Sequence, residues 1–185
     1  MITTARTEAT AKKKLSSTKH KDNMKDLIVV DMQKGFINEK NEFLVEKINS
    51  LLKNNRFNCV YYTRFRNHSE CPFKTLLNYD EMMEKDAQEI IVSRKNNSCV
   101  LHKSSYGLDP NDIELLKAKD VKEIYLCGTD VDACILAIAF QLFDSGIKPI
   151  LVWDAVGSSS KTDFKESLKP LFQRNFGNDS IIEHI

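Results

Sequence analysis

Residues 124–146 read IYLCGTDVDACILAIAFQLFDSG, and this stretch decides the fold. It opens with the short run 124–127, which is apolar at every position and therefore typical of a strand buried on both faces. A polar turn follows. Residues 132–144 then have the pattern of a helix that starts at Asp132 and stops before Gly146. Strand, turn and helix in this order form half of a βαβ unit.

The same alternation runs through the rest of the chain. Apolar runs that indicate further buried strands lie at 27–30, 59–62, 99–101 and 150–153. Helical patterns lie between strands, at 43–54 and, after the capping pair Asp109-Pro110, at 110–118. The sequence therefore predicts an α/β protein: one domain over residues 24–185, three layers, doubly wound, with a mainly parallel five- or six-stranded sheet whose last strand lies near 180–184.

Composition narrows the class of protein. The chain has 185 residues, of which 42% are apolar, which suits one globular domain with a real core. Its net charge of +1 gives no general reason to expect a nucleic-acid or membrane partner, and no apolar stretch approaches the roughly 20 residues of a membrane-spanning helix. Five cysteines without paired spacing or a signal peptide argue against a disulfide framework, so we expect a reducing, cytoplasmic location.

Residues 1–23 form a separate block rich in Thr, Ala, Ser and Lys, with almost no large apolar residue. Such a segment cannot bury enough surface to offset the entropy of ordering, which predicts a disordered basic tail. The alternative is a targeting segment or a basic docking arm, favoured only by the run of lysines at 12–14.

Three chemically distinctive residues stand at predicted strand ends or just beyond them. Asp31 follows the first run, Lys103 the third, and Cys134 the turn after the fourth. Taken singly, each has an ordinary structural explanation. Asp31 would be a turn or helix-capping residue, Lys103 a solvent-exposed lysine and Cys134 a core residue. Because the carboxyl ends of parallel strands share one sheet edge, we expect the three to converge. A thiol at a helix start, beside an ammonium, should have a pKa below about 8.5. Asp31 could then accept its proton, and first-turn amides could face a substrate oxyanion.

At these positions the sequence resembles the isochorismatase-like cysteine hydrolases. The segments that carry the resemblance are 29–33 (VVDMQ) with Phe36, then Lys103, then 128–134 (GTDVDAC), with further agreement at 62–64, 140–146, 154–155 and Ser158. The likeness extends over residues 26–177. It implies a Rossmann-like domain that hydrolyses a carbon–nitrogen bond through a thioester.

The resemblance also implies roles. Cys134 attacks the carbonyl, Asp31 is the acid/base, and Lys103 orients both. A cis peptide is implied at Thr129–Asp130, so that the backbone N–H groups of Asp130 and Cys134 form the oxyanion hole. Nicotinamidases of this family usually have a small residue at the position of Asp130, and this chain departs from them there.

Nicotinamidases also bind a metal through an Asp-x-His-x-x-His pattern. Residues 63–71 (TRFRNHSEC) contain the single histidine His68, best interpreted as a loop residue, so the sequence predicts no metal and no cofactor. Around the pocket we expect Phe36, Arg64, Tyr106 and Trp153. Arg64 either holds a substrate carboxylate or is an exposed structural residue, and Tyr106 either lines the pocket or only packs.

Other functions remain to be weighed. Isochorismatases proper cleave a vinyl ether with their aspartate and do not require the thiol, so the cysteine favours amide, ureido or imide-like small molecules. The principal alternative is a non-catalytic binding or interaction module on the same fold. A thiol-redox pair of Cys134 with Cys127 lacks Cys-x-x-Cys spacing. We expect a small-molecule substrate and a homodimer or homotetramer.

Overall fold

A computed structural model describes residues 25–55, 57–162 and 164–185. Its sheet contains, within those residues, six parallel strands in the order β3-β2-β1-β4-β5-β6. The strands are β1 (Lys25–Val30), β2 (Phe57–Phe65), β3 (Ser98–Lys103), β4 (Glu123–Gly128), β5 (Lys148–Val156) and β6 (Ile181–Ile182). The predicted α/β fold with a parallel sheet is confirmed. The predicted basic tail, residues 1–23, lies outside the described residues.

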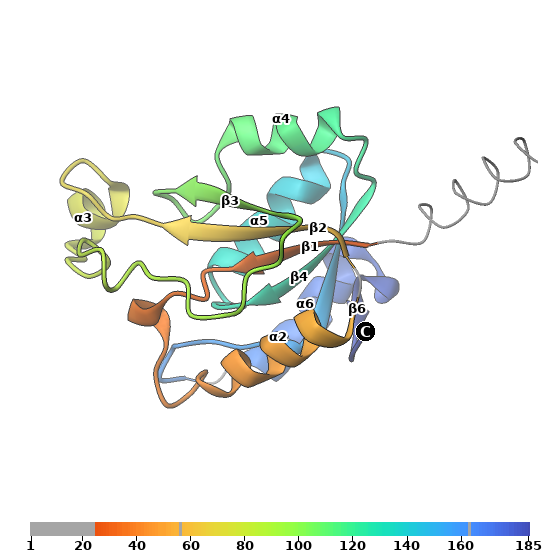
Figure 1. Cartoon of the computed structure of the whole chain (residues 1–185), viewed down its shortest axis with the longest axis horizontal. Coiled ribbons are helices and arrows are strands. Elements are labelled where there is room, and N and C mark those ends of the chain that lie inside the picture. The colour runs from red at the N-terminus through yellow and green to blue at the C-terminus, as the bar shows by residue number, and fades with distance from the viewer. Residues whose placement is uncertain (1–24, 56, 163) are drawn as a thin grey trace, which may run out of the picture.

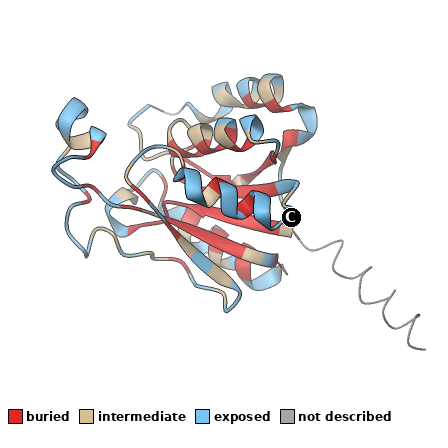
Figure 2. Ribbon diagram, turned by 90° about the horizontal axis from the view of Figure 1, so that it is seen from above, coloured by how far each residue is buried: buried red, intermediate tan, exposed pale blue. Residues whose placement is uncertain are grey.

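Helices cover both faces of this sheet (Figure 1). They are α2 (Phe43–Asn54), α3 (Pro72–Leu77), α4 (Pro110–Ala118), α5 (Cys134–Asp144) and α6 (Lys165–Phe176), with short 3-10 turns η1 (Lys34–Phe36) and η2 (Asn178–Ser180). One large apolar cluster joins α4, α5 and α6 to one face of the sheet, and a second joins α2 to the other. The four central strands β2, β1, β4 and β5 are mostly buried between these layers, whereas the edge strands β3 and β6 are more exposed (Figure 2).

Two helices form as their local sequence predicts. α2 buries Leu44, Ile48, Leu51 and Leu52, which lie on one face at helical spacing. α4 begins after Asp109, whose side chain accepts a hydrogen bond from the Asn111 N–H at 2.9 Å. The helix predicted at 132–144 begins at Cys134 instead, because residues 131–133 form a turn.

Residues 66–97 connect β2 to β3, and we call them the cap segment. The part that contains α3 extends beyond the carboxyl ends of the strands, and the remainder returns to the start of β3 (Figure 1). The segment contains α3 and packs on the sheet through a small third cluster of Phe65, Cys71 and Met82. A side chain at Gly35 would overlap the Met82 sulfur, at 2.3 Å, so glycine permits this close packing.

No helix within 25–55, 57–162 or 164–185 is both long and apolar enough to cross a membrane.

Candidate active site

Asp31, Lys103 and Cys134 are in contact at the carboxyl edge of the sheet. Asp31 directly follows β1, Lys103 is the last residue of β3, and Cys134 is the first residue of α5. The Lys103 Nζ lies 2.8 Å from Asp31 Oδ2 and 3.3 Å from Cys134 Sγ. All three side chains are buried. The structure thus brings together the carboxylate, the ammonium and the thiol that the sequence placed at separate strand ends.

Asp31 is fixed by the neighbouring strand. Its φ of 46° turns the chain sharply at the end of β1, a left-handed conformation that Asp tolerates better than most residues. The Asp31 N–H donates to Thr63 Oγ1 at 2.8 Å, and the Thr63 hydroxyl donates to Asp31 Oδ1 at 2.5 Å. One carboxylate oxygen is therefore bound by Thr63, and the other faces Lys103.

Lys103 is held on several sides. Besides its two partners in the triad, Nζ donates to the carbonyl oxygens of Ser105 at 2.9 Å and Tyr106 at 3.3 Å, and it lies 5.3 Å from the centre of the Phe65 ring. Burial alone would lower the pKa of this ammonium. Interactions with the Asp31 carboxylate and with Cys134 outweigh burial and raise it, so Lys103 stays protonated.

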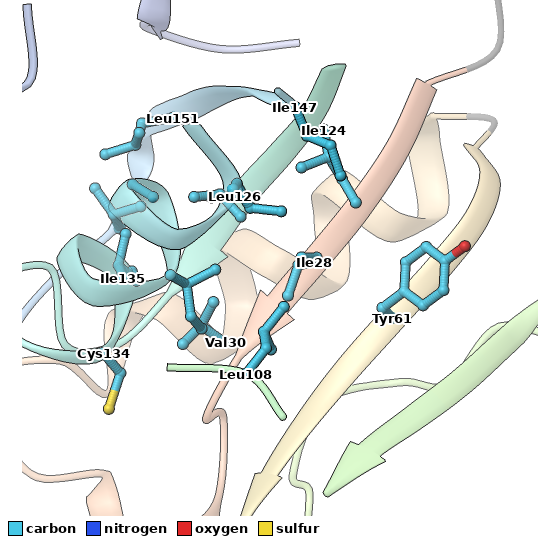
Figure 3. Packing of buried hydrophobic residues seen from close by; sticks show 14 of the residues in the cluster. Ile28, Val30, Tyr61, Leu108, Ile124, Leu126, Cys134, Ile135, Ile147 and Leu151 are labelled. Carbon is cyan, nitrogen blue, oxygen red and sulfur yellow. The ribbon is translucent and has the colours of Figure 1, made fainter. Parts of the chain in front are cut away.

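The Cys134 thiol differs from the sequence-based expectation. Its pKa is raised, first by burial and then by the Asp31 carboxylate, while Lys103 opposes both. The prediction of a pKa below 8.5 is therefore wrong for the free protein. The Asp31–Lys103 pair already balances its own charge, so a thiolate would add an unbalanced one. Cys134 rests as a thiol, and Figure 3 shows its sulfur directed away from the labelled aliphatic residues.

Backbone amides lie unpaired beside the thiol. The peptide bond Thr129–Asp130 is cis, as the resemblance implied. The turn that follows is held by donation from the N–H groups of Val131 to Gly157 and of Ala133 and Ile135 to the Asp130 carbonyl. Within the part of the chain that the structure describes, the N–H groups of Asp130 and Cys134 have no such partner. Two N–H donors therefore remain available in the turn that leads into α5.

A cavity of about 670 Å³ opens over this edge of the sheet. Its wall includes Asp130 and Ala133, which immediately precede the thiol, and four aromatic residues: Phe36, Phe73, Tyr79 and Tyr106. Phe73 of the cap segment contacts Tyr106, with ring centres 4.6 Å apart. Phe36 and Tyr106, which the sequence analysis expected around the pocket, line this cavity, whereas Asp31, Lys103 and Cys134 are not among its lining residues.

Arg64 and Trp153 do not line this cavity, which corrects the expectation for both. Trp153 is buried in the apolar cluster under α5 and α6, where its indole N–H donates to Glu166 at 3.1 Å. Arg64 borders a different opening, together with Arg66 and Asp86. Both side chains project from strands whose alternate residues face opposite sides of the sheet.

Sequence reasoning missed a polar network that holds Asp130. The Ser159 N–H donates to Asp130 Oδ1 at 2.6 Å, and the Ser159 hydroxyl donates to Oδ2 at 2.8 Å. The Thr129 hydroxyl also donates to the carboxylate. Asn41 Nδ2 donates to Thr129 at 3.1 Å, and Asn38 Nδ2 donates to the Ser159 carbonyl at 2.9 Å. The sequence analysis named Thr129, Asp130 and Ser158, and no pattern in it indicated the contributions of Asn38, Asn41 and Ser159.

Among the described residues, no group of three or more His, Cys, Asp or Glu side chains is arranged to hold a metal ion. His68 is exposed, and its backbone N–H donates to the Asn67 side chain at 3.0 Å.

Comparisons with known proteins identify a family for this chain. Residues 26–177 match the model of the isochorismatase domain. Isochorismatase domain-containing protein 2 from Danio rerio is 33% identical over 73 residues, which are 38% of this chain and 37% of that protein. The chain thus spans little more than a third of that curated relative's length.

Solved structures show the likeness in three dimensions. N-carbamoylsarcosine amidase from Thermoplasma acidophilum superposes with a TM-score of 0.69 at 21% identity, covering 83% of this chain and 93% of that one. Nicotinamidase/pyrazinamidase PncA from Bacillus subtilis gives a TM-score of 0.69 at 18% identity, covering 86% and 100%. At these identities the likeness establishes a shared fold.

Proposed function

This chain belongs to the isochorismatase domain family, and from that premise we propose that it hydrolyses a carbon–nitrogen bond of a small amide, ureido or imide-like molecule through a thioester on Cys134. The observation that carries the proposal is the contact of Lys103 with both Asp31 and Cys134, the latter directly after Ala133 in the cavity wall. Acyl transfer needs a nucleophile, a base and a site for the oxyanion, and this edge of the sheet offers all three.

In the first half-reaction the Cys134 sulfur bonds to the substrate carbonyl carbon while its proton passes to Asp31. The carbonyl electron pair moves onto oxygen, which accepts hydrogen bonds from the Asp130 and Cys134 N–H groups. The carbon–nitrogen bond then breaks, and Asp31 returns the proton to the departing nitrogen. A raised thiol pKa agrees with this sequence, because the proton leaves only as the new bond forms.

In the second half-reaction water attacks the thioester and gives a proton to Asp31. The carbon–sulfur bond breaks, the acid leaves, and the sulfur regains its proton. Lys103 acts throughout as a fixed cation that holds both partners in place and offsets the negative charge that develops near them. The thiol favours this chemistry over vinyl-ether cleavage, in which it has no task. Two structural relatives have names that denote amide hydrolysis.

A screen of small amides and ureas for released ammonia or amine tests the proposal. Wild type should turn over at least one substrate, with an acyl adduct on Cys134 detected by mass spectrometry, and EDTA should leave the activity intact. Cys134→Ala should abolish turnover. Cys99→Ala is the matched control, since this cysteine is exposed on the sheet edge, and it should keep full activity.

Two results would redirect the proposal. Activity that survives Cys134→Ala indicates cleavage by the aspartate alone, as in the vinyl-ether hydrolases. Absence of turnover and of any adduct across the screen favours the non-catalytic binding module, which keeps the fold and loses the reaction.

A further inference from the structure

The cavity wall carries negative charge and no positive charge. Glu81, from the cap segment, and Asp130, beside the thiol, both line the cavity, whereas its other lining residues are uncharged. The cap lysine close by, Lys74, forms an ion pair with Asp80 and is thereby neutralised. A ligand in the cavity therefore meets two carboxylates without a compensating cation in the wall.

The neighbouring triad of Asp31, Lys103 and Cys134 does not change this balance. Lys103 is paired with Asp31 at 2.8 Å, so the two buried charges cancel, and Cys134 rests as an uncharged thiol. Arg64 and Arg66, which could attract an anion, border the separate opening. The field within the cavity is thus set by the carboxylates of its walls.

Asp130 is placed where its charge affects the proposed reaction. Its backbone N–H is one of the two donors proposed for the oxyanion, and the same residue lines the cavity. Three donors from Ser159 and Thr129 hold the carboxylate, while burial and, to a lesser extent, Asp132 raise its pKa. That charge extends across the cavity: the pKa of the Tyr79 phenol is raised by burial, by Glu81 and also by Asp130.

We infer that the substrate of this site carries a positively charged group, such as a quaternary ammonium, a primary ammonium or a guanidinium, which binds between Asp130, Glu81 and the aromatic wall. The inference deepens the proposed function and rests on it for the reaction. Aromatic faces attract cations, and Phe36, Phe73, Tyr79 and Tyr106 supply four rings in the same wall. A bound cation also offsets the Asp130 carboxylate as the oxyanion forms, which a neutral substrate cannot do.

The geometry disfavours anionic substrates at the same site. A carboxylate in the cavity would face like charges from both walls, and it would lie away from Arg64, which the sequence analysis had considered as its partner.

Equilibrium binding to Cys134→Ala tests the inference without turnover. The probes are 4-(trimethylammonio)butanamide, its uncharged isostere 5,5-dimethylhexanamide and the anionic 5-amino-5-oxopentanoate, measured by titration calorimetry. We expect the cationic amide to bind at least about tenfold more tightly than the isostere, and the anion more weakly than either. Equal or tighter binding of the isostere, or no binding of the cation, overturns the inference.

Charge-removing variants locate the effect in wild-type protein. Glu81→Gln and Asp130→Asn should each reduce the preference of kcat/KM for the cationic amide over the isostere by about threefold or more. Asp154→Asn is the matched control, because Asp154 pairs with Lys47 outside this cavity, and it should keep the preference. Glu81 is exposed, so its variant reports even where Asp130→Asn does not fold. An unchanged preference in Glu81→Gln counts against the inference.

These outcomes separate the inference from the proposed function. A protein that hydrolyses all three probes alike keeps the thioester mechanism and loses the charge preference. A protein that hydrolyses none of them, yet binds the cation preferentially, keeps the preference and loses the reaction.

Discussion

The triad of Asp31, Lys103 and Cys134 and the cap segment are built in opposite ways. In the triad, Asp31 and Lys103 are almost fully buried, and each has partners from a neighbouring strand or from backbone carbonyls. In the cap segment, α3 has no buried residue, and Leu76 is 80% exposed. Figure 2 shows the same contrast, with buried strands beside a mostly exposed projection. The contrast indicates that the groups proposed for chemistry lie in the buried core. Recognition of the substrate is assigned in part to the more exposed cap segment.

The largest effect should follow from removing the buried cation. Lys103→Ala should lower turnover by a factor of about 10² to 10³ and reduce the free energy of unfolding by about 3–5 kcal/mol, because it leaves the Asp31 carboxylate buried and unpaired. Turnover of a good substrate and urea unfolding measure the two effects. Lys34→Ala is the matched control, since Lys34 pairs with Asp86 at the same 2.8 Å but in solvent, and it should change stability little. Equal losses in the two variants would remove the distinction between buried and exposed pairs.

Two phenylalanines in contact allow the stability of the sheet core to be compared directly with that of the cap segment. Phe65 is fully buried at the end of β2, and its ring centre lies 4.7 Å from that of half-buried Phe73 in α3. Phe65→Ala should reduce the free energy of unfolding by about 3–5 kcal/mol, as large core truncations do. Phe73→Ala should have a clearly smaller effect on stability and should mainly raise KM. Thermal unfolding and steady-state kinetics measure this, and a reversed order would show that the cap is the more rigid region.

A smaller effect should appear in thiol reactivity. Cys99 is exposed on the edge strand, whereas Cys134 is buried with a raised pKa. Iodoacetamide at pH 7.5 should therefore alkylate Cys99 at least about tenfold faster than Cys134, and the Cys134 rate should keep rising with pH through 9. Peptide mapping by mass spectrometry over time measures both rates. Faster labelling of Cys134 would mean that its thiolate is stabilised after all, and that the helix start and Lys103 outweigh burial.

Alkaline pH should also reduce the free energy of unfolding through Lys103 and Cys134. The folded-state pKa values of Lys103 and Cys134 are both raised, so the folded chain holds protons that the unfolded chain releases. The contribution of these groups is then complete at neutral pH and is lost as the pH rises past the ordinary cysteine and lysine pKa values. Unfolding free energy measured from pH 7 to 10.5 should decline over the upper part of that range. A flat profile would contradict the raised pKa values.

Much of the fold could be predicted from the sequence because its elements carry strong local patterns. The stripe of α2 and the Asp109-Pro110 start of α4 coincide with the observed helices. α6 has no comparable signal, since Pro170 stands inside it and its apolar residues are few. The cap segment also lacks a hydrophobic period, and its shape depends on contacts with Phe65 and Gly35 that are distant in sequence.

The sequence could predict that the site residues meet at the strand ends. It could not predict which side chains surround them or how deeply they are buried. Parallel strands bring Asp31 and Lys103 to one edge whatever the side-chain packing. Trp153 was misplaced because an apolar run at 150–153 does not reveal which residues face which layer; Val152 lies in one cluster and Trp153 in the other. The thiol pKa was misjudged because burial depth and the Asp31 charge depend on tertiary structure.

The two backbone ligands of Lys103 have a consequence for evolution. The ammonium binds the carbonyl oxygens of Ser105 and Tyr106, which every amino acid possesses, and not their side chains. The loop that brings Tyr106 to the cavity is thus anchored independently of what the loop displays. Mutations at positions 105 and 106 can alter substrate choice while the anchor, and the reactive groups tied to it, stay in place. Selection can therefore search new substrates here without first rebuilding the chemistry.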